Sequence, residues 1–479
     1  MNIKLKQIGI VYDSDIVLDG LTIITGKNNS GKTTIGKALY SILDAVSDIQ
    51  QKYQADKVFY IKTRLDEVRS ILDFFRMFSI IREEENPLFG EYPQIKRLFE
   101  REYRRGIAQD FIEEYAHDLL SELNDLDVQS IINNKQLLLL YKHLEKSRVL
   151  SLINSISEQK TEAIKILQMM FSTLQSIEAT DYIRESINQT LQIEFAGQIQ
   201  PVRQAKGESS LELYENDSVY FKFRIKDNKI IKDENPVYFS SPIKRAFLID
   251  DPFVIDENTY SRRLIHGQGE HEIETILNPN RIISHNEKLI SSLKATRPLT
   301  VLEQTALEDA VRSIKEQIDS IIPGSFEFTS NGEFYIQDGL KLKVSNLATG
   351  SKMYSIIKIL LEKGLLDSST MLILDEPEAH LHPQWQNAFA ETIAMLVKKQ
   401  DINVLLTTHS PNFVLALDAF MRKYGIQEKT NFYQTHARED GLIDYVCAND
   451  NLGVIYQDFT NYLSEMKMLR DHYLYGIEE

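Results

Sequence analysis

The chain has 479 residues, of which 43% are hydrophobic and 26% charged, proportions that exclude a disordered or membrane-spanning protein and suggest two or three compact units. Lys and Arg total 54 against 70 Asp and Glu, and the resulting net charge of −16 argues against a protein that coats nucleic acid with its whole surface. The single cysteine, Cys447, excludes an internal disulfide and a multi-thiolate zinc site.

The first 45 residues predict the N-terminal lobe of an α/β nucleotide-binding core. Strands are expected over residues 4–11 and 16–25, the second interrupted at Asp19 and Gly20. The second ends in Leu21–Thr25, an apolar run typical of a strand buried on both faces. A helix is expected over residues 32–48, where apolar residues recur at helical spacing.

A glycine-rich turn separates that strand from that helix. Its sequence, Gly26-Lys27-Asn28-Asn29-Ser30-Gly31-Lys32-Thr33, matches the G-x-x-x-x-G-K-[ST] pattern of a phosphate-binding loop, or P-loop. Backbone N–H groups of the turn and the helix N-terminus would surround a phosphate. Lys32 is expected to contact the β- and γ-phosphates, and Thr33 to ligate Mg²⁺. The predicted ATP-binding residues here are Gly26, Asn28, Asn29, Ser30, Gly31, Lys32, Thr33 and Thr34.

The middle of the chain predicts an interruption of this core. Residues 46–195 are expected to form a helical insertion, residues 196–260 antiparallel core strands, residues 261–322 a helical segment, and residues 323–479 the C-terminal lobe with a closing helix. No segment is apolar over 18 residues and no apolar leader opens the chain, so we expect a cytoplasmic protein without membrane contact.

Two basic clusters in these segments leave two interpretations open, a solvated helix face or a groove that contacts nucleic-acid phosphates. The first cluster contains Lys96, Arg97, Arg101, Arg104 and Arg105, and the second contains Arg262 and Arg263.

The C-terminal lobe contains a strand that ends in two carboxylates. Four apolar residues, 371–374, precede Asp375 and Glu376. Asp375 is expected to hold Mg²⁺, directly or through water, and Glu376 to act as general base on the attacking water. A solvated strand end is the alternative.

Two other motifs flank this strand. A polar turn at the start of a helix, with Thr349, Gly350, Ser351 and Lys352, predicts a second anion-binding site, although most such turns are only helix caps. His409 follows an apolar strand and is expected to hydrogen-bond the γ-phosphate; a satisfied core histidine is the alternative.

Together these four motifs resemble the ATP-binding cassette (ABC) type of ATPase, in the branch shared by the structural-maintenance-of-chromosomes (SMC), RecF and overcoming-lysogenisation-defect proteins. Asp375–Pro383 resembles the extended Walker B motif and D-loop, and Leu347–Ser351 stands at the position of the signature motif. The resemblance implies an α/β head with a mixed sheet, split by the helical insertion. It also implies a dimer that encloses two ATP molecules head to tail, the P-loop of one subunit facing the signature turn of the other.

The sequence departs from this family at two points. The usual signature serine is Ala348 here, so Thr349, Ser351 or the cation Lys352 would have to contact the γ-phosphate on the other subunit. For Lys352, a solvated helix residue is the alternative.

The family's Q-loop glutamine has no clear counterpart, and Gln198 is the candidate. Asp250 is expected to be a capped strand end, with a place in the lining of the site as the alternative. Tyr12 is expected to be a half-buried strand end, with adenine stacking as the alternative.

Size and motif wording are most similar to the PtuA family, the ATPases of the Septu anti-phage systems, which also occur with some retrons. The resemblance implies that ATP binding restrains an assembly and that infection releases a partner nuclease of the HNH type, PtuB. The residues after His409 show no acidic cluster, so the nuclease is expected to be a separate protein encoded nearby. Nucleic acid would be reached through that partner or through retron RNA or DNA.

Two other functions stay open. An ATPase similar to AriA of the PARIS systems would restrain a different toxic effector. A DNA-repair clamp similar to RecF or SMC would need a long coiled coil or a basic tunnel, and the sequence shows neither clearly. A transporter ATPase is excluded because the insertion between Lys32 and Asp375 is far too long.

Overall fold

The computed structural model describes residues 1–71, 111–125, 127, 146–202, 208–215, 218–232, 241–256, 283–295, 301–329 and 332–475. The chain divides into two compact units. The first comprises Met1–Asp48, Ile183–Glu272 and Ile282–Glu479, and the second comprises Ile49–Tyr182 and Ile273–Arg281. Both basic clusters of the sequence, at residues 96–105 and at 262–263, lie outside the described residues.

The first unit is built on a mixed sheet whose order, within the described residues, is β6-β5-β4-β1-β2-β14-β13-β3-β12-β11-β7. Its strands are β1 (Asn2–Ile8), β2 (Val11–Val17), β3 (Leu21–Thr25), β4 (Ser209–Glu215), β5 (Ser218–Lys226), β6 (Lys229–Ile230), β7 (Arg245–Ile249), β11 (Thr370–Asp375), β12 (Asn403–Thr408), β13 (Thr430–Ala437) and β14 (Ile443–Cys447). From β13 to β7 the neighbours are parallel, and from β6 to β2 they are antiparallel. The expected α/β class with a mixed sheet is confirmed.

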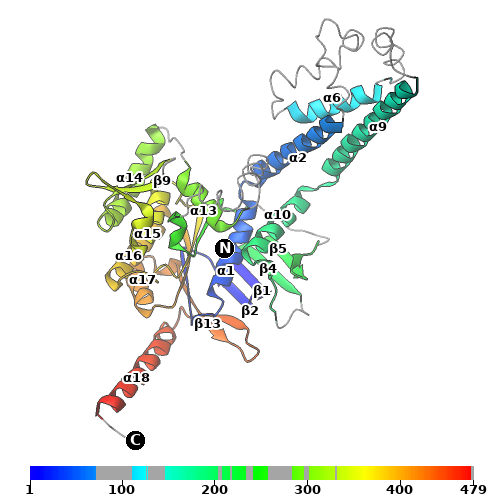
Figure 1. Cartoon of the computed structure of the whole chain (residues 1–479). Coiled ribbons are helices and arrows are strands. Elements are labelled where there is room, and N and C mark those ends of the chain that lie inside the picture. The colour runs from blue at the N-terminus through cyan, green and yellow to red at the C-terminus, as the bar shows by residue number, and fades with distance from the viewer. Residues whose placement is uncertain are drawn as a thin grey trace. The chain divides into compact units, whose positions relative to one another are not determined.

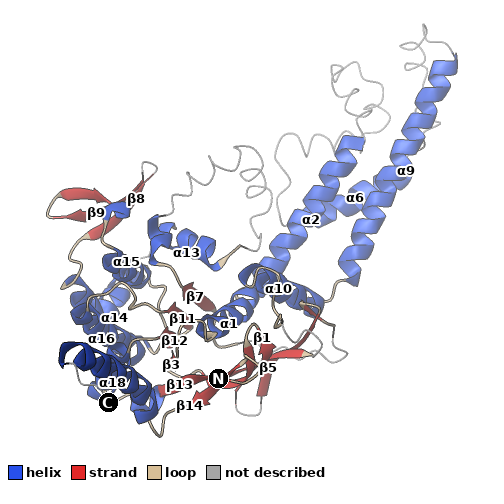
Figure 2. Cartoon of the chain, turned by 60° about the horizontal axis from the view of Figure 1, so that its bottom comes forward, coloured by secondary structure: helices blue, strands red, loops and turns tan. Residues whose placement is uncertain are grey.

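The parallel strands are covered by helices on both faces. Leu21 and Ile23 of β3 pack into one buried cluster with the helices of the C-terminal lobe, whereas Ile24 packs into another with α1 (Lys32–Val46). Figure 2 shows the same arrangement, with α1 on one side of β3, β12 and β11 and with α14, α15 and α16 on the other. Burial on both faces is why β3 has apolar residues that point to both sides of the sheet; its two threonines, Thr22 and Thr25, are buried as well.

Two expectations about strands need correction. Residues 1–25 form three strands rather than two, because the chain reverses between Ile8 and Val11, so that residues 11–17 form a strand of their own. The break before β3 falls at the interruption expected at Asp19 and Gly20. Gly9 and Gly20 have φ of 58° and 61°, a conformation that favours glycine and ends a strand. The second correction concerns residues 196–260, which are expected to form antiparallel strands. One strand in this range, β7, instead pairs in parallel with β11.

The remaining elements of the first unit are α13 (His285–Lys294), α14 (Val301–Asp319), α15 (Thr349–Glu362), α16 (Pro383–Gln400), α17 (Pro411–Lys423) and α18 (Gly453–Tyr475), the short helices η3 (Pro252–Asp256), η4 (Val344–Asn346) and η5 (Gln427–Lys429), and a small sheet of β8 (Ser325–Thr329), β9 (Gly332–Gln337) and β10 (Leu340–Lys343). The helix α10 (Ala179–Glu194) begins in the second unit and ends in the first.

The second unit is helical in its described residues. Its helices are α2 (Ile49–Ile71), α6 (Ile112–Asp125) and α9 (Lys146–Ser176), and Figure 1 shows α2 and α9 alongside each other with α6 across them. The three share one apolar cluster that includes Ile61 and Leu167. No helix in the described part of the chain is long and apolar enough to cross a membrane.

Candidate functional site

The P-loop turn lies where β3 ends and α1 begins, at the carboxyl edge of the parallel strands. Asn29 and Gly31 have φ of 61° and 73°, so the turn depends on residues that tolerate the left-handed conformation. At Gly26 a Cβ atom would lie 1.8 Å from Thr435 Oγ1, so no side chain fits. Gly31 is therefore required by its backbone conformation, and Gly26 by the lack of space for a side chain.

Lys32 is the first residue of α1 and is only 4% exposed. Its ammonium donates hydrogen bonds to the carbonyl oxygens of Gly26 (3.1 Å) and Lys27 (2.8 Å) and lies 3.2 Å from Glu376 Oε1. Carbonyl oxygens are acceptors that phosphate oxygens can replace. The ammonium is thus held inside the turn, at the position where a phosphate would be bound.

A pocket opens in front of this turn. Its walls come from the P-loop, from the β1–β2 turn, from the end of α10 and from the end of β11. The lining residues are Gly9, Ile10, Asn28, Asn29, Ser30, Gly31, Lys32, Thr33, Thr34, Lys37, Glu194, Phe195, Ala196, Asp375 and Glu376. All predicted residues of the P-loop motif except Gly26 line the pocket. The carbonyl group of Gly26 accepts a hydrogen bond from Lys32.

The acidic end of β11 meets the P-loop in this pocket. Thr33 Oγ1 donates a hydrogen bond to Asp375 Oδ2 over 2.6 Å, and Thr407, on the neighbouring strand β12, donates to Asp375 Oδ1. A hydroxyl and a carboxylate are hard oxygen donors of the kind that Mg²⁺ prefers. The two residues predicted as metal ligands are therefore in contact, and their donor set fits that ion.

Glu376 has an unusual backbone conformation, with φ of 48°. Its N–H group donates to both the carbonyl and the hydroxyl oxygen of Thr407, each at 3.1 Å. His409 Nδ1 lies 3.2 Å from Glu376 Oε2, at ion-pair distance but without hydrogen-bond geometry. Strained backbone of this kind persists where neighbouring contacts impose it, and it is concentrated at functional sites.

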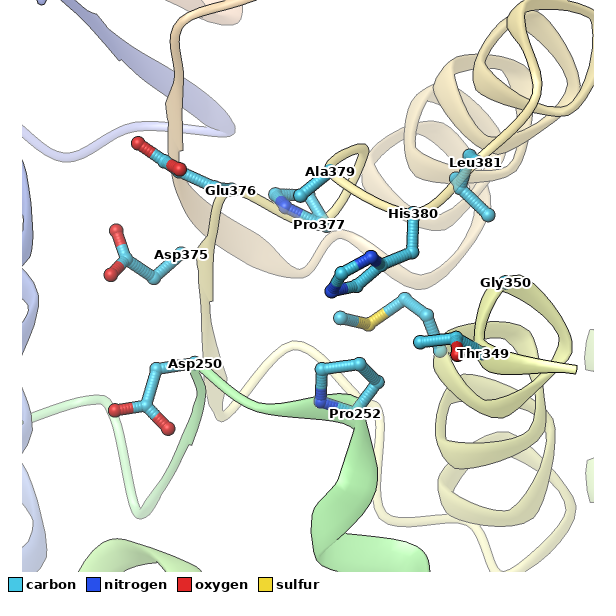
Figure 3. Close-up of a pocket in the computed structure, with 11 residues that line it drawn as sticks. Asp250, Pro252, Thr349, Gly350, Asp375, Glu376, Pro377, Ala379, His380 and Leu381 are labelled. Carbon is cyan, nitrogen blue, oxygen red and sulfur yellow. The ribbon is translucent and has the colours of Figure 1, made fainter. Parts of the chain in front are cut away.

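The signature turn forms the N-terminus of α15 and packs against the D-loop. Its N-cap, Ala348, supplies no side-chain hydrogen bond. Thr349 and Gly350 line a second pocket with Asp375 and Glu376, as Figure 3 shows, and four D-loop residues complete that wall: Pro377, Ala379, His380 and Leu381. At Gly350 a Cβ atom would lie 3.0 Å from the carbonyl oxygen of His380. The turn and the D-loop are therefore in close contact through backbone.

Lys352 differs from expectation. It is neither solvated nor presented to a second subunit, because it is only 2% exposed. Its ammonium pairs with the carboxylate of Asp256 and lies 4.7 Å from the ring centroid of Phe253, both on η3. We therefore withdraw the expectation that Lys352 reaches a phosphate across an interface. Ser351 does not line either of the two pockets described here.

A family model described as "AAA domain, putative AbiEii toxin, Type IV TA system" matches residues 21–416, which include all four motifs. The chain belongs to this AAA-domain family. No curated protein matches the sequence.

Among solved structures, this AAA-domain protein is similar to the SMC head domain of Thermotoga maritima, with 11% identity and a TM-score of 0.35 over 93% of this chain and 97% of that one. It is also similar to an Smc head domain with coiled coil and joint from Pyrococcus yayanosii, with 11% identity and a TM-score of 0.33 over 95% and 99% of the two chains. A third similar structure is an SmcHead bound to the C-winged helix domain of ScpA, with 12% identity and a TM-score of 0.37 over 93% and 96%.

The Q-loop candidate does not hold. Gln198 is exposed and does not line the P-loop pocket, although the nearby residues 194–196 do. Asp250, expected to be a capped strand end, instead lines the pocket of Figure 3 with Asp375 and Glu376. For Tyr12, the Arg438 guanidinium lies 3.7 Å from its ring centroid.

Two features of the site were missed from the sequence. Glu378 is 2% exposed, its carboxylate accepts a hydrogen bond from Thr408, and burial raises its pKa. Its place beside Asp375 in the motif was a signal that could have singled it out.

The second missed feature is a buried cluster of Glu194, His285 and Asp250. Burial opposes the charged form of His285, but hydrogen bonds and charge from the two carboxylates raise its pKa to about 9. Burial likewise opposes ionisation of Asp250, but the hydrogen bond and charge of His285, with a contribution from Lys37, lower its pKa. These residues lie far apart in the chain, so no sequence spacing indicated the cluster.

Proposed function

We propose that this AAA-domain protein binds ATP with Mg²⁺ and hydrolyses the bond between its β- and γ-phosphates. The observation that carries the proposal is the 2.6 Å contact of Thr33 with Asp375, which joins the P-loop to the acidic strand end in one pocket. In P-loop ATPases the bound metal neutralises phosphate charge. Here Lys32 would move its hydrogen bonds from the turn's carbonyl groups to the phosphates.

In this proposal Glu376 is the general base. Its strained backbone and its two hydrogen bonds to Thr407 fix where its carboxylate stands, next to both Lys32 and His409. A base must be positioned before its basicity matters. His409 would hydrogen-bond the γ-phosphate and respond to its loss, since its contact with Glu376 is not a formed hydrogen bond.

We further propose that two chains enclose ATP head to tail, with the α15 N-terminus of one chain facing the P-loop of the other. The first N–H groups of a helix are unpaired within the helix and attract anions. The Ser351 N–H group donates to the Ala348 carbonyl oxygen, and Ala348 provides no side-chain cap. The N–H groups of Thr349 and Gly350 are therefore the ones that we assign to a phosphate of the second chain. Thr349 and Gly350 are the contact residues that we assign to this interface.

We propose a role in anti-phage defence of the PtuA type, in which the ATPase restrains a partner nuclease. The family description names a "putative AbiEii toxin" of a type IV toxin–antitoxin system, which supports a role in a toxin-based system.

The ATPase proposal is tested by the substitution Glu376→Gln. We expect the turnover of ATP to fall by roughly 10²–10⁴-fold, because the general base is lost while the P-loop is intact. ATP should then be retained and dimers should accumulate in size-exclusion chromatography. Turnover at the wild-type rate would show that Glu376 is not the base. The defence proposal is tested separately, by co-purification of a neighbouring gene product and nuclease assays with and without ATP.

A further inference from the structure

A buried histidine connects two walls of the site. His285, the first residue of α13, is 7% exposed. Its Nδ1 lies 2.6 Å from Glu194 Oε2, and its Nε2 lies 3.0 Å from Asp250 Oδ1. Its backbone N–H also donates to Glu194 Oε1 over 3.0 Å. Both oxygens of Glu194 therefore hold this one residue in place.

The contacts determine the charge of the ring. A neutral imidazole has one donor and one acceptor nitrogen, so it can satisfy only one of two carboxylates. Both ring nitrogens of His285 face carboxylate oxygens, and only the imidazolium can donate to both. The cluster is thus a positive ring between two negative groups. Asp250 shares its pocket with the carboxylates of Asp375 and Glu376. Without the positive ring, the repulsion among these negative charges would be less compensated.

The two ends of the cluster reach the two pockets. Glu194 ends α10 and lines the P-loop pocket. Asp250 directly follows β7, which pairs with β11 so that Ile249 stands opposite Leu374. Asp250 and Asp375 are consequently the next residues of two adjacent parallel strands. Figure 3 shows their carboxyl groups pointing to the same side of the pocket.

We propose that His285 is a positioning residue, which holds the Asp250 carboxylate beside Asp375 so that two adjacent strand ends present a pair of oxygen donors to the Mg²⁺ that accompanies ATP. The inference rests on the proposed ATPase function. Mg²⁺ in proteins takes one or two carboxylates and keeps several waters, so a second carboxylate beside Asp375 has a use there. The link to Glu194 ties this carboxylate to the wall of the P-loop pocket.

The test is the Mg²⁺ dependence of nucleotide binding, measured with a fluorescent ATP analogue first in a chelator and then during titration with Mg²⁺. His285→Asn removes the double donor, and Asp250→Asn removes the charge but keeps an oxygen that accepts from His285. Both should raise the half-saturating Mg²⁺ concentration about 10–100-fold, the usual effect of losing an outer-shell partner of a metal site. Binding without Mg²⁺ should stay at the wild-type level, which a general disruption of the fold would not allow.

Asp251→Asn is the matched control, since it changes the adjacent carboxylate, which lies outside both pockets and only accepts from the Phe253 N–H group. We expect its Mg²⁺ dependence to match the wild type. The double variant His285→Asn with Asp250→Asn should lose no more than the more affected single variant, because the two residues act as one unit.

Thermal melting of each variant establishes that it folds. If His285→Asn does not fold, Asp250→Asn carries the test, because it leaves the buried ring hydrogen-bonded. A folded variant of either kind with wild-type Mg²⁺ dependence would overturn the inference while leaving the ATPase proposal intact. A wild-type protein that binds no ATP at any Mg²⁺ concentration would overturn both.

Discussion

Two helix N-termini in this molecule each hold a lysine that is almost completely buried, Lys32 in α1 and Lys352 in α15. Lys32 itself lines an open pocket and donates to two backbone carbonyl groups of the P-loop, acceptors that can be exchanged for phosphate oxygens. Lys352 is neutralised by the Asp256 carboxylate and covered by the Phe253 ring. Burial therefore does not distinguish a ligand-binding lysine from a structural one; the exchangeability of its partners does.

The largest effect that separates the two lysines should come from Lys32→Ala. We expect ATP affinity to fall roughly 100-fold or more, because each hydrogen bond to a charged group contributes about 1.5–3 kcal/mol. Isothermal titration with ATP and Mg²⁺ measures this. Thermal stability should be retained, since Lys32 lines the open pocket and its two carbonyl partners belong to the same turn. Unchanged affinity in a folded variant would remove the P-loop from the nucleotide site.

Lys352→Met should affect stability rather than binding. Removing one partner of a buried ion pair leaves the other charge uncompensated, and the free energy of unfolding should fall by about 3 kcal/mol. Denaturant unfolding measures the loss, and adding Asp256→Asn to the same chain should restore much of it. Wild-type stability together with lost turnover would revive the idea that Lys352 acts on a phosphate of another subunit.

Thr407→Val should disturb Glu376, the carboxylate that Lys32 contacts. Thr407 is 1% exposed, and its hydroxyl donates to Asp375 and accepts from the Glu376 N–H group. We expect a loss of about 2 kcal/mol in stability because a charged acceptor loses its donor. ATP turnover should fall while ATP affinity is kept. Thr392→Val, an equally buried threonine that bonds only to a helix carbonyl, is the control; an equal loss of turnover there would contradict the assignment.

Ala348→Ser should have the smallest effect and the opposite sign. Serine at the N-cap accepts from the first turn of a helix and stabilises it by about 1 kcal/mol. Ala348 makes no such bond, so a small rise in melting temperature is expected. If the α15 N-terminus binds a phosphate of a second chain, the serine should also alter ATP-dependent dimerisation. A melting temperature below that of the wild type would mean that the turn cannot accept the cap.

The parts predicted correctly from the sequence are those in which one short segment contains all the residues that determine its structure. The residues from Leu21 to Thr33 combine a strand buried on both faces, a glycine turn and a helix start, and the physical demands of each are local. The strand that ends at Asp375 and Glu376 is of the same kind. These two segments were enough to predict the α/β class and the lysine and threonine that meet the acidic strand end.

The tertiary structure decided everything that depends on which segments become neighbours. Sheet order places β7 next to β11, and this alone makes Asp250 a neighbour of Asp375. Gln198 is excluded because the fold leaves it exposed and outside the P-loop pocket. The environment of a side chain is likewise supplied by other segments: Asp256 makes Lys352 structural, and Glu194 and Asp250 make His285 a charged ring. These contacts join residues that are 35 to 96 positions apart in the sequence. No local sequence pattern can reveal a contact over such a separation.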